Sequence, residues 1–165
     1  MPILATMFTI TTYGTWLRGD VRGWVDDGIV FPPDAVLEAR DQVRLNEQPF
    51  YFGQSDRVAV GEAIGRALID RMNVRVLALC VQSWHSHFVI SDTDRDLADV
   101  VKCAKDAARW KLRNDRRIWG TGYDKRFCFD EQSARARIAY VEKHNVRDGL
   151  AARPWDFISE WSGGN

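Results

Sequence analysis

A strand, a tight turn and a second strand are predicted by the stretch 73–91, which reads NVRVLALCVQSWHSHFVIS. The runs 73–82 and 84–91 are both rich in β-branched and apolar residues, and the short gap between them favours a β-hairpin. His85 and His87 alternate with Ser86 in the second run. Side chains two residues apart leave the same face of a strand, so these two imidazoles should lie side by side, about 7 Å apart at Cα.

The elements on either side of this hairpin predict an α+β fold. Apolar and β-branched residues at 3–12 indicate a strand. Amphipathic spacing predicts a helix that is capped by Ser55 or Asp56 and extends to about 72, and another helix over 96–113. A short strand is expected at 125–129 and a last helix over about 130–145 with Asp130 as its N-cap. The order is β-α-β-β-α-β, which is the ferredoxin-like antiparallel sheet with helices on one face, followed by a C-terminal helix that carries Tyr140.

The whole chain, 1–165, is expected to be a single domain interrupted by an excursion at about 13–54. Glycine–aspartate turns fill much of this segment, and a short helix capped by Asp34 is predicted over about 35–46. Ordered excursions of this length tend to carry function.

Composition indicates an ordinary globular protein. Of 165 residues, 45% are hydrophobic and 28% charged, which excludes a disordered or fibrous chain. No apolar run approaches the roughly 20 residues of a membrane helix, and the N-terminus has no basic flank or cleavage site typical of a secretory signal. Three widely spaced cysteines fit reduced, buried thiols, so we expect a cytoplasmic protein without membrane partners.

Charge is distributed unevenly although the net charge is zero. The segment 101–153 holds 14 lysines and arginines against 7 aspartates and glutamates. This excess is typical either of a solvated helix face or of an anionic partner. For DNA, the residues expected to contact phosphates are those on the outer face of the 96–113 helix: Lys102, Lys105, Arg109 and Lys111.

The third histidine, His144, lies four residues after Tyr140 in the last predicted helix, so the two share one helical face. Together with His85 and His87 it can form a three-ligand site for a divalent cation, with open positions for a phosphate. A tyrosine hydroxyl beside such a site can attack a phosphodiester and form a phosphotyrosine. Two other interpretations stay open: a zinc hydrolase that uses three histidines, and a non-catalytic nucleic-acid-binding module of the same fold.

Two motifs in this order resemble a known family. His85-Ser86-His87 is similar to the HUH motif of single-strand DNA endonucleases and transposases. The run YVEKHNVRDGL at 140–150 resembles the tyrosine-helix signature of single-tyrosine transposases related to insertion sequence 200, in the branch of REP-associated tyrosine transposases. The residues that match this signature are Tyr140, Val146, Arg147, Gly149 and Leu150, and the segments 12–17 and 153–155 are also similar to that branch.

This resemblance implies a metal-dependent single-strand DNA transesterase that cleaves and rejoins DNA through a 5′-phosphotyrosine. It implies that Tyr140 is the nucleophile, that His85, His87 and His144 bind Mg²⁺ or Mn²⁺, and that the partner is single-stranded DNA with hairpin-bearing ends or palindromic repeats, bound by a monomer or a homodimer. Two positions depart from the family pattern: Ser86 replaces a bulky apolar residue, and His144 replaces an amide. Imidazole is a softer ligand than an amide, which favours Mn²⁺ or another transition ion over Mg²⁺.

Overall fold

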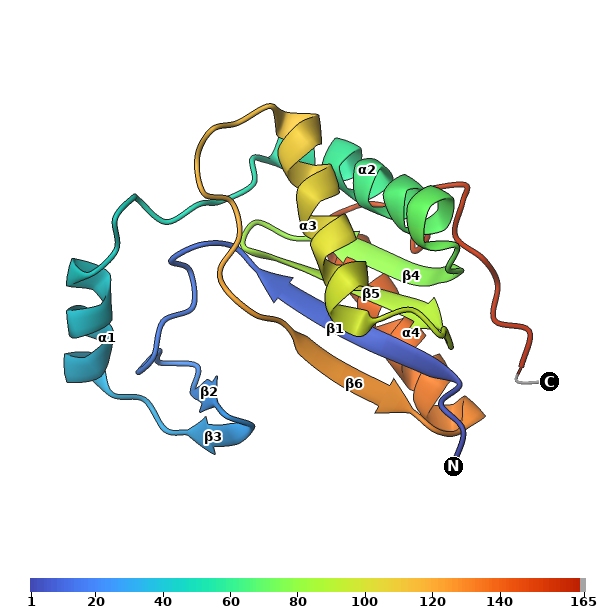
Figure 1. Cartoon of the computed structure of the whole chain (residues 1–165), viewed down its shortest axis with the longest axis horizontal. Helices are drawn as coiled ribbons and strands as arrows, with labels where there is room; N and C mark the ends of the chain where they lie inside the picture. Colours follow the sequence, from blue (N-terminus) through green and yellow to red (C-terminus); the bar gives the residue numbers. More distant parts are fainter. Residues whose placement is uncertain (164–165) are drawn as a thin grey trace.

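A four-stranded antiparallel sheet forms the centre of the protein (Figure 1). The computed structural model describes residues 1–163. The strands follow the spatial order β4-β5-β1-β6 and have the bounds β1 (Ala5–Thr11), β4 (Val76–Val81), β5 (His85–Ser91) and β6 (Asp124–Cys128). With the helices α2 (Gln54–Met72) and α3 (Leu97–Leu112) between them, this is the β-α-β-β-α-β arrangement, so the expected ferredoxin-like α+β fold is confirmed.

The two faces of the sheet are covered by different helices. Helices α2 and α3 lie on one face, and α4 (Glu131–Arg147) lies behind the sheet on the other (Figure 1). Phe8, Ile10 and Phe88 belong to the core under α2 and α3, whereas Met7 and Val89 belong to the core under α4. Because neighbouring strand residues alternate between faces, His85 and His87 share the α4 face with Val89.

Between β1 and α2 the chain forms a small lobe of β2 (Trp24–Asp26), β3 (Ile29–Phe31) and α1 (Ala35–Val43), seen apart from the sheet in Figure 1. Asp34 caps α1 as expected, with its side chain accepting from the backbone N–H of Val36 and Leu37, but the helix ends three residues earlier than predicted. The β2–β3 hairpin was not expected. Its turn places Asp27 and Gly28 at φ 47° and 77°, the left-handed backbone that a two-residue hairpin turn requires.

Helix α2 begins differently from the prediction. Its N-cap is Gly53, which has no side chain to bond, so the expected cap by Ser55 or Asp56 is wrong. Its buried positions include Gly61 and Gly65, against which the rings of Trp155 and Phe157 pack. The chain after α4 therefore returns across α2, and the Trp155 indole N–H donates to the Val58 carbonyl at 2.9 Å.

The three cysteine thiols are free. Cys80 and Cys128 are buried and Cys103 is partly buried, in line with the packing role expected from the sequence. Within residues 1–163, no helix combines the length and the hydrophobicity that a membrane span needs.

Candidate metal centre and tyrosine site

His85 and His87 are the first and third residues of β5, next to the end of β1. Their Cα partners on β1 are Thr11 and Thr9, and both residues are more than nine-tenths buried. Ser86 points to the opposite face, where its hydroxyl donates to the Cys80 carbonyl at 2.8 Å. This bond satisfies the buried hydroxyl and explains how a serine fits between the two histidines.

Helix α4 carries Tyr140 and His144 over this end of the sheet. Its inner side is buried, and Asn145 at the end of that side is 1% exposed. The Asn145 amide donates to the carbonyls of Leu79 and Ala152, at 2.9 and 3.1 Å. The last turn of α4 is thereby fixed to β4, next to the histidine strand.

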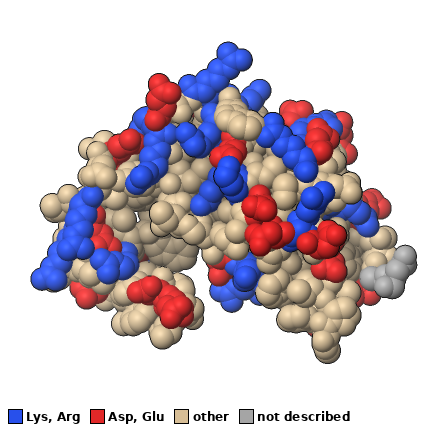
Figure 2. Space-filling view, in the orientation of Figure 1, with Lys and Arg blue, Asp and Glu red and all other residues tan. Residues whose placement is uncertain are grey.

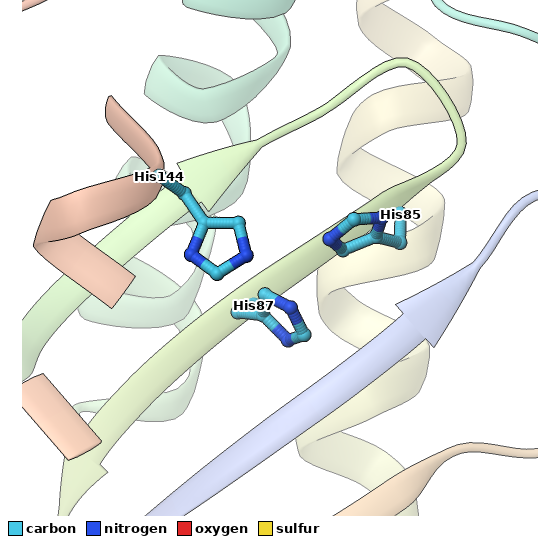
Figure 3. Close-up of side chains that lie close together, drawn as sticks. All are labelled: His85, His87 and His144. Carbon is cyan, nitrogen blue, oxygen red and sulfur yellow. The ribbon is translucent and has the colours of Figure 1, made fainter. Parts of the chain in front are cut away.

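The three imidazoles converge (Figure 3). Their ligand nitrogens all lie within 4.8 Å of one another, and the ring centroids are 4.5 Å apart for His85 and His87 and 4.9 Å apart for His87 and His144. Zinc and similar ions hold imidazole nitrogens at about 2.0–2.1 Å, so two nitrogens on one tetrahedral ion lie about 3.4 Å apart. The most widely separated nitrogens of the cluster have to approach by up to about 1.4 Å to share one ion.

The hydrogen bonds of two of the rings leave their outer nitrogens free for a cation. Nδ1 of His144 is 2.8 Å from the Tyr140 carbonyl oxygen, which can only accept, so Nδ1 carries the proton and Nε2 has a free lone pair. Nδ1 of His87 is 2.8 Å from the Thr9 hydroxyl, which leaves its Nε2 free. Partners of this kind orient histidine ligands in metal sites.

His85 has an unsatisfied nitrogen. Its Nδ1 is buried without a hydrogen-bond partner among the described residues. A buried polar atom without a partner is costly, and a cation or an ordered water would satisfy it. The three imidazoles and this orphaned atom fit a divalent cation.

Burial keeps the two strand histidines neutral at physiological pH. It lowers the pKa of His85 to about 4, with smaller contributions from the neighbouring His144 and Arg22. It lowers the pKa of His87 to about 3, helped by His85 and His144. Since only the neutral imidazole binds a metal, both residues are ready to act as ligands without losing a proton.

Tyr140 lies at the rim of this cluster. Its ring centroid is 4.7 Å from that of His144 and 5.4 Å from that of His87, and the residue is 45% exposed. Its ring touches the histidine cluster while the residue stays accessible to a substrate from solvent.

Sequence reasoning missed a second layer of residues behind His85. The Trp84 ring centroid is 4.1 Å from that of His85, and the Arg22 guanidinium lies 4.3 Å from the Trp84 centroid. Asp20 and the Thr15 carbonyl hold this guanidinium in place. The sequence shows charged residues around the glycine turns of the excursion, but it contains no pattern that predicts their position next to His85.

The four basic residues expected to hold DNA all lie on α3, across the sheet from the histidines. Figure 2 shows lysines and arginines interspersed with acidic side chains over this face. Lys102 pairs with Asp106 at 2.6 Å. Lys105 is half-buried, and its ammonium group donates to the carbonyls of Gly120 and Gly122 at 3.0 and 2.9 Å. Arg109 and Lys111 are exposed.

Fold and site together define a ferredoxin-like domain in which three histidines, two on a strand and one on a helix, converge beside a tyrosine of that helix. No family model matches the sequence, and no curated protein matches it either. A solved structure of a REP-associated tyrosine transposase bound to a REP hairpin shares this fold, with a TM-score of 0.53 and 13% identity over 100% of this chain and 93% of that one. The resemblance noted in the motifs is thus confirmed at the level of the fold.

A second solved structure, a candidate transposase from Deinococcus radiodurans R1, is 16% identical over 92% of this chain and 94% of its own. Its TM-score is 0.44.

Proposed function

We propose that this protein is a metal-dependent single-strand DNA transesterase of the tyrosine transposase type, with Tyr140 as its nucleophile and His85, His87 and His144 as its metal ligands. The observation that carries the proposal is the position of an accessible tyrosine ring 4.7 Å from a histidine that itself belongs to a three-imidazole cluster.

The chain's own residues suit one chemical step. The Tyr140 oxygen forms a bond to the phosphorus of a phosphodiester, the bond from phosphorus to the 3′ oxygen breaks, the phenol loses its proton and the 3′ oxygen takes one up. A divalent cation, when bound, neutralises charge on the phosphate and makes phosphorus more electrophilic. The product keeps a phosphodiester bond to Tyr140, so a new 3′-hydroxyl can reverse the step and join another DNA end.

The donor set favours a borderline transition ion. Three imidazoles and no carboxylate are poor ligands for Mg²⁺, which prefers oxygen, and better ligands for Mn²⁺. We therefore expect Mn²⁺ to support the reaction at lower concentration than Mg²⁺.

The expected substrate is single-stranded DNA that carries a hairpin. The structural neighbour of shared fold was solved with a REP hairpin, which is a property of that protein, and the basic excess of 101–153 gives this chain a surface for phosphates. We propose that the reaction takes place in the cytoplasm.

The proposal is tested by incubating the protein with labelled, hairpin-bearing single-stranded DNA and Mn²⁺, followed by a denaturing gel. The wild type should yield a covalent protein–DNA adduct, and Tyr140→Phe should yield none while it still binds DNA. Tyr123→Phe is the matched control, because Tyr123 packs against Phe8 away from the histidine cluster. An adduct that persists in Tyr140→Phe contradicts the assignment.

The same gel distinguishes a zinc hydrolase. In that enzyme an activated water attacks, so cleavage would survive Tyr140→Phe, release free ends and disappear in His144→Ala. A transesterase loses the adduct in both variants.

We further propose that α3 binds DNA away from the cleaved phosphate. Arg109 and Lys111 are exposed, Lys102 is exposed but paired with Asp106, and the Lys105 ammonium is already bonded to two carbonyls. Arg109→Glu and Lys111→Glu should each weaken the binding of every DNA sequence. Each should also make the slope of log K against log salt concentration shallower by about one, because one phosphate contact is lost. Lys105→Glu should instead lower the thermal stability. Unchanged affinity in the first two variants would remove α3 from the interface.

A further inference from the structure

A cavity of about 920 Å³ is lined by residues of the excursion and by Trp84, which lies in the turn just before the histidine strand. Figure 2 shows a hollow between the lobe of α1 with the β2–β3 hairpin and the main body. Glu38 and Gln42 of α1 line one wall, and Tyr51 and Trp84 line the others. Its volume lies in the upper part of the range of small-molecule sites, about 300–1,000 Å³.

The cavity borders the proposed catalytic centre. Trp84 is a wall of the cavity, precedes His85 in sequence and lies with its ring centroid 4.1 Å from that of His85. Arg22, which also lines the cavity, stacks on Trp84. A group bound in the cavity would therefore be separated from the metal ligands by one aromatic ring.

The lining suits an uncharged planar ring better than a phosphate. Arg22 is the basic residue of the lining, and its charge is compensated by Asp20 at 2.6 Å. The carboxylate of Glu38 and the amide of Gln42 lie one helical turn apart and face the same cavity. Amides and carboxylates pair with the edges of nucleobases, and aromatic side chains such as Tyr51 stack on their faces.

We propose that this cavity binds the base of an unpaired nucleotide next to the cleaved phosphodiester and selects that base by its hydrogen-bonding edge. The proposal rests on the proposed transesterase function and adds to it a specificity site built by the excursion. Glu38 and Gln42 select the base, and Tyr51 supplies the stacking surface. The acidic lining keeps the DNA backbone outside the cavity, with the sugar–phosphate chain running past Trp84 toward Tyr140.

The probe is a pool of DNA hairpins with ten randomised unpaired nucleotides on each side, bound to the full protein with Mn²⁺ and sequenced after selection. Wild type should enrich one base about tenfold over the others at one unpaired position, the size expected of a good pair of hydrogen bonds. Gln42→Ala and Glu38→Gln should abolish or change that preference. Gln132→Ala, which removes an exposed glutamine of α4 outside the cavity, should keep it.

Tyr51→Ala tests the stacking surface separately, because Tyr51 is 60% exposed and its removal should leave the fold intact. It should weaken binding of the enriched sequence by about fivefold or more but not that of a sequence with an abasic site at the selected position. Enrichment that is absent in wild type, or unchanged in both Gln42→Ala and Glu38→Gln, overturns the cavity as a base-selecting site. If the wild type still forms adducts with the pool but shows no such enrichment, the proposed transesterase function stands and only the base-selecting cavity is refuted. If the pool neither binds nor forms adducts, both proposals are refuted.

Discussion

Asn145→Ala removes the amide that fixes the end of α4 to the sheet. Asn145 is 1% exposed and donates to two carbonyls, those of Leu79 and Ala152. Each hydrogen bond contributes about 1 kcal/mol net, and each buried carbonyl left without a partner costs about 1–3 kcal/mol. We expect the free energy of unfolding to fall by about 2–4 kcal/mol, which for a chain of this size lowers Tm by roughly 5–15 °C.

The assay is thermal unfolding followed by circular dichroism, with Asn114→Ala as the matched control. Asn114 accepts one exposed hydrogen bond, from the backbone N–H of Arg116, so its variant should lose less than about 1 kcal/mol. A Tm of Asn145→Ala within about 2 °C of wild type would refute the reasoning.

A second measurement separates loss of stability from loss of position. Because Asn145 follows His144, the variant should also bind Mn²⁺ more weakly at a temperature where it is fully folded, as measured by calorimetry. Unchanged Mn²⁺ affinity in the folded variant would show that this anchor stabilises α4 without placing His144.

Three further outcomes follow from the same geometry. Saturating Mn²⁺ should raise the free energy of unfolding, by about 2.7 kcal/mol at 100 times Kd, and EDTA should reverse the rise in Tm; no shift in Tm would count against the centre. Burial lowers the pKa of His85 to about 4 and of His87 to about 3, so the unfolded chain binds more protons below pH 6.5. The free energy of unfolding of the metal-free protein should therefore have its full value above pH 6.5 and fall as the pH decreases toward 4, by up to about 1.4 kcal/mol per pH unit for each histidine. A pH series of Tm values in wild type and His87→Gln measures this decrease. Gly61→Ala would place a Cβ against the Trp155 ring and should lower the free energy of unfolding by at least about 1–3 kcal/mol in urea, whereas an unchanged midpoint would contradict the close packing of these residues.

Local rules were enough to predict the order of the sheet strands with their covering helices and the meeting of the three histidines. The period of two on a strand places His85 and His87 on one face, and the spacing of four on a helix places Tyr140 beside His144. Given the fold, α4 has one free face of the sheet to cover, and that face carries the two strand histidines.

The same local rules could not predict contacts between segments that are distant in the sequence. The pattern of α3 places Lys105 on the outside, but the chain at 120–122 folds over it and its carbonyls accept from the ammonium group. In the same way, no local signal brings Arg22 from the excursion onto Trp84. The β2–β3 hairpin was missed because its strands are only three residues long and mostly exposed, which leaves no alternation for a sequence pattern to show.

The hydrogen bond from His144 Nδ1 to the Tyr140 carbonyl, 2.8 Å long, spans a single turn of α4. It ties the third imidazole to the backbone of the residue that carries the phenol, so the two groups form one mechanical unit. If α4 shifts along or away from the sheet, both groups move with it. His144 therefore joins the other two imidazoles only when Tyr140 is also next to them. A metal bound by all three histidines is then always accompanied by a correctly placed nucleophile.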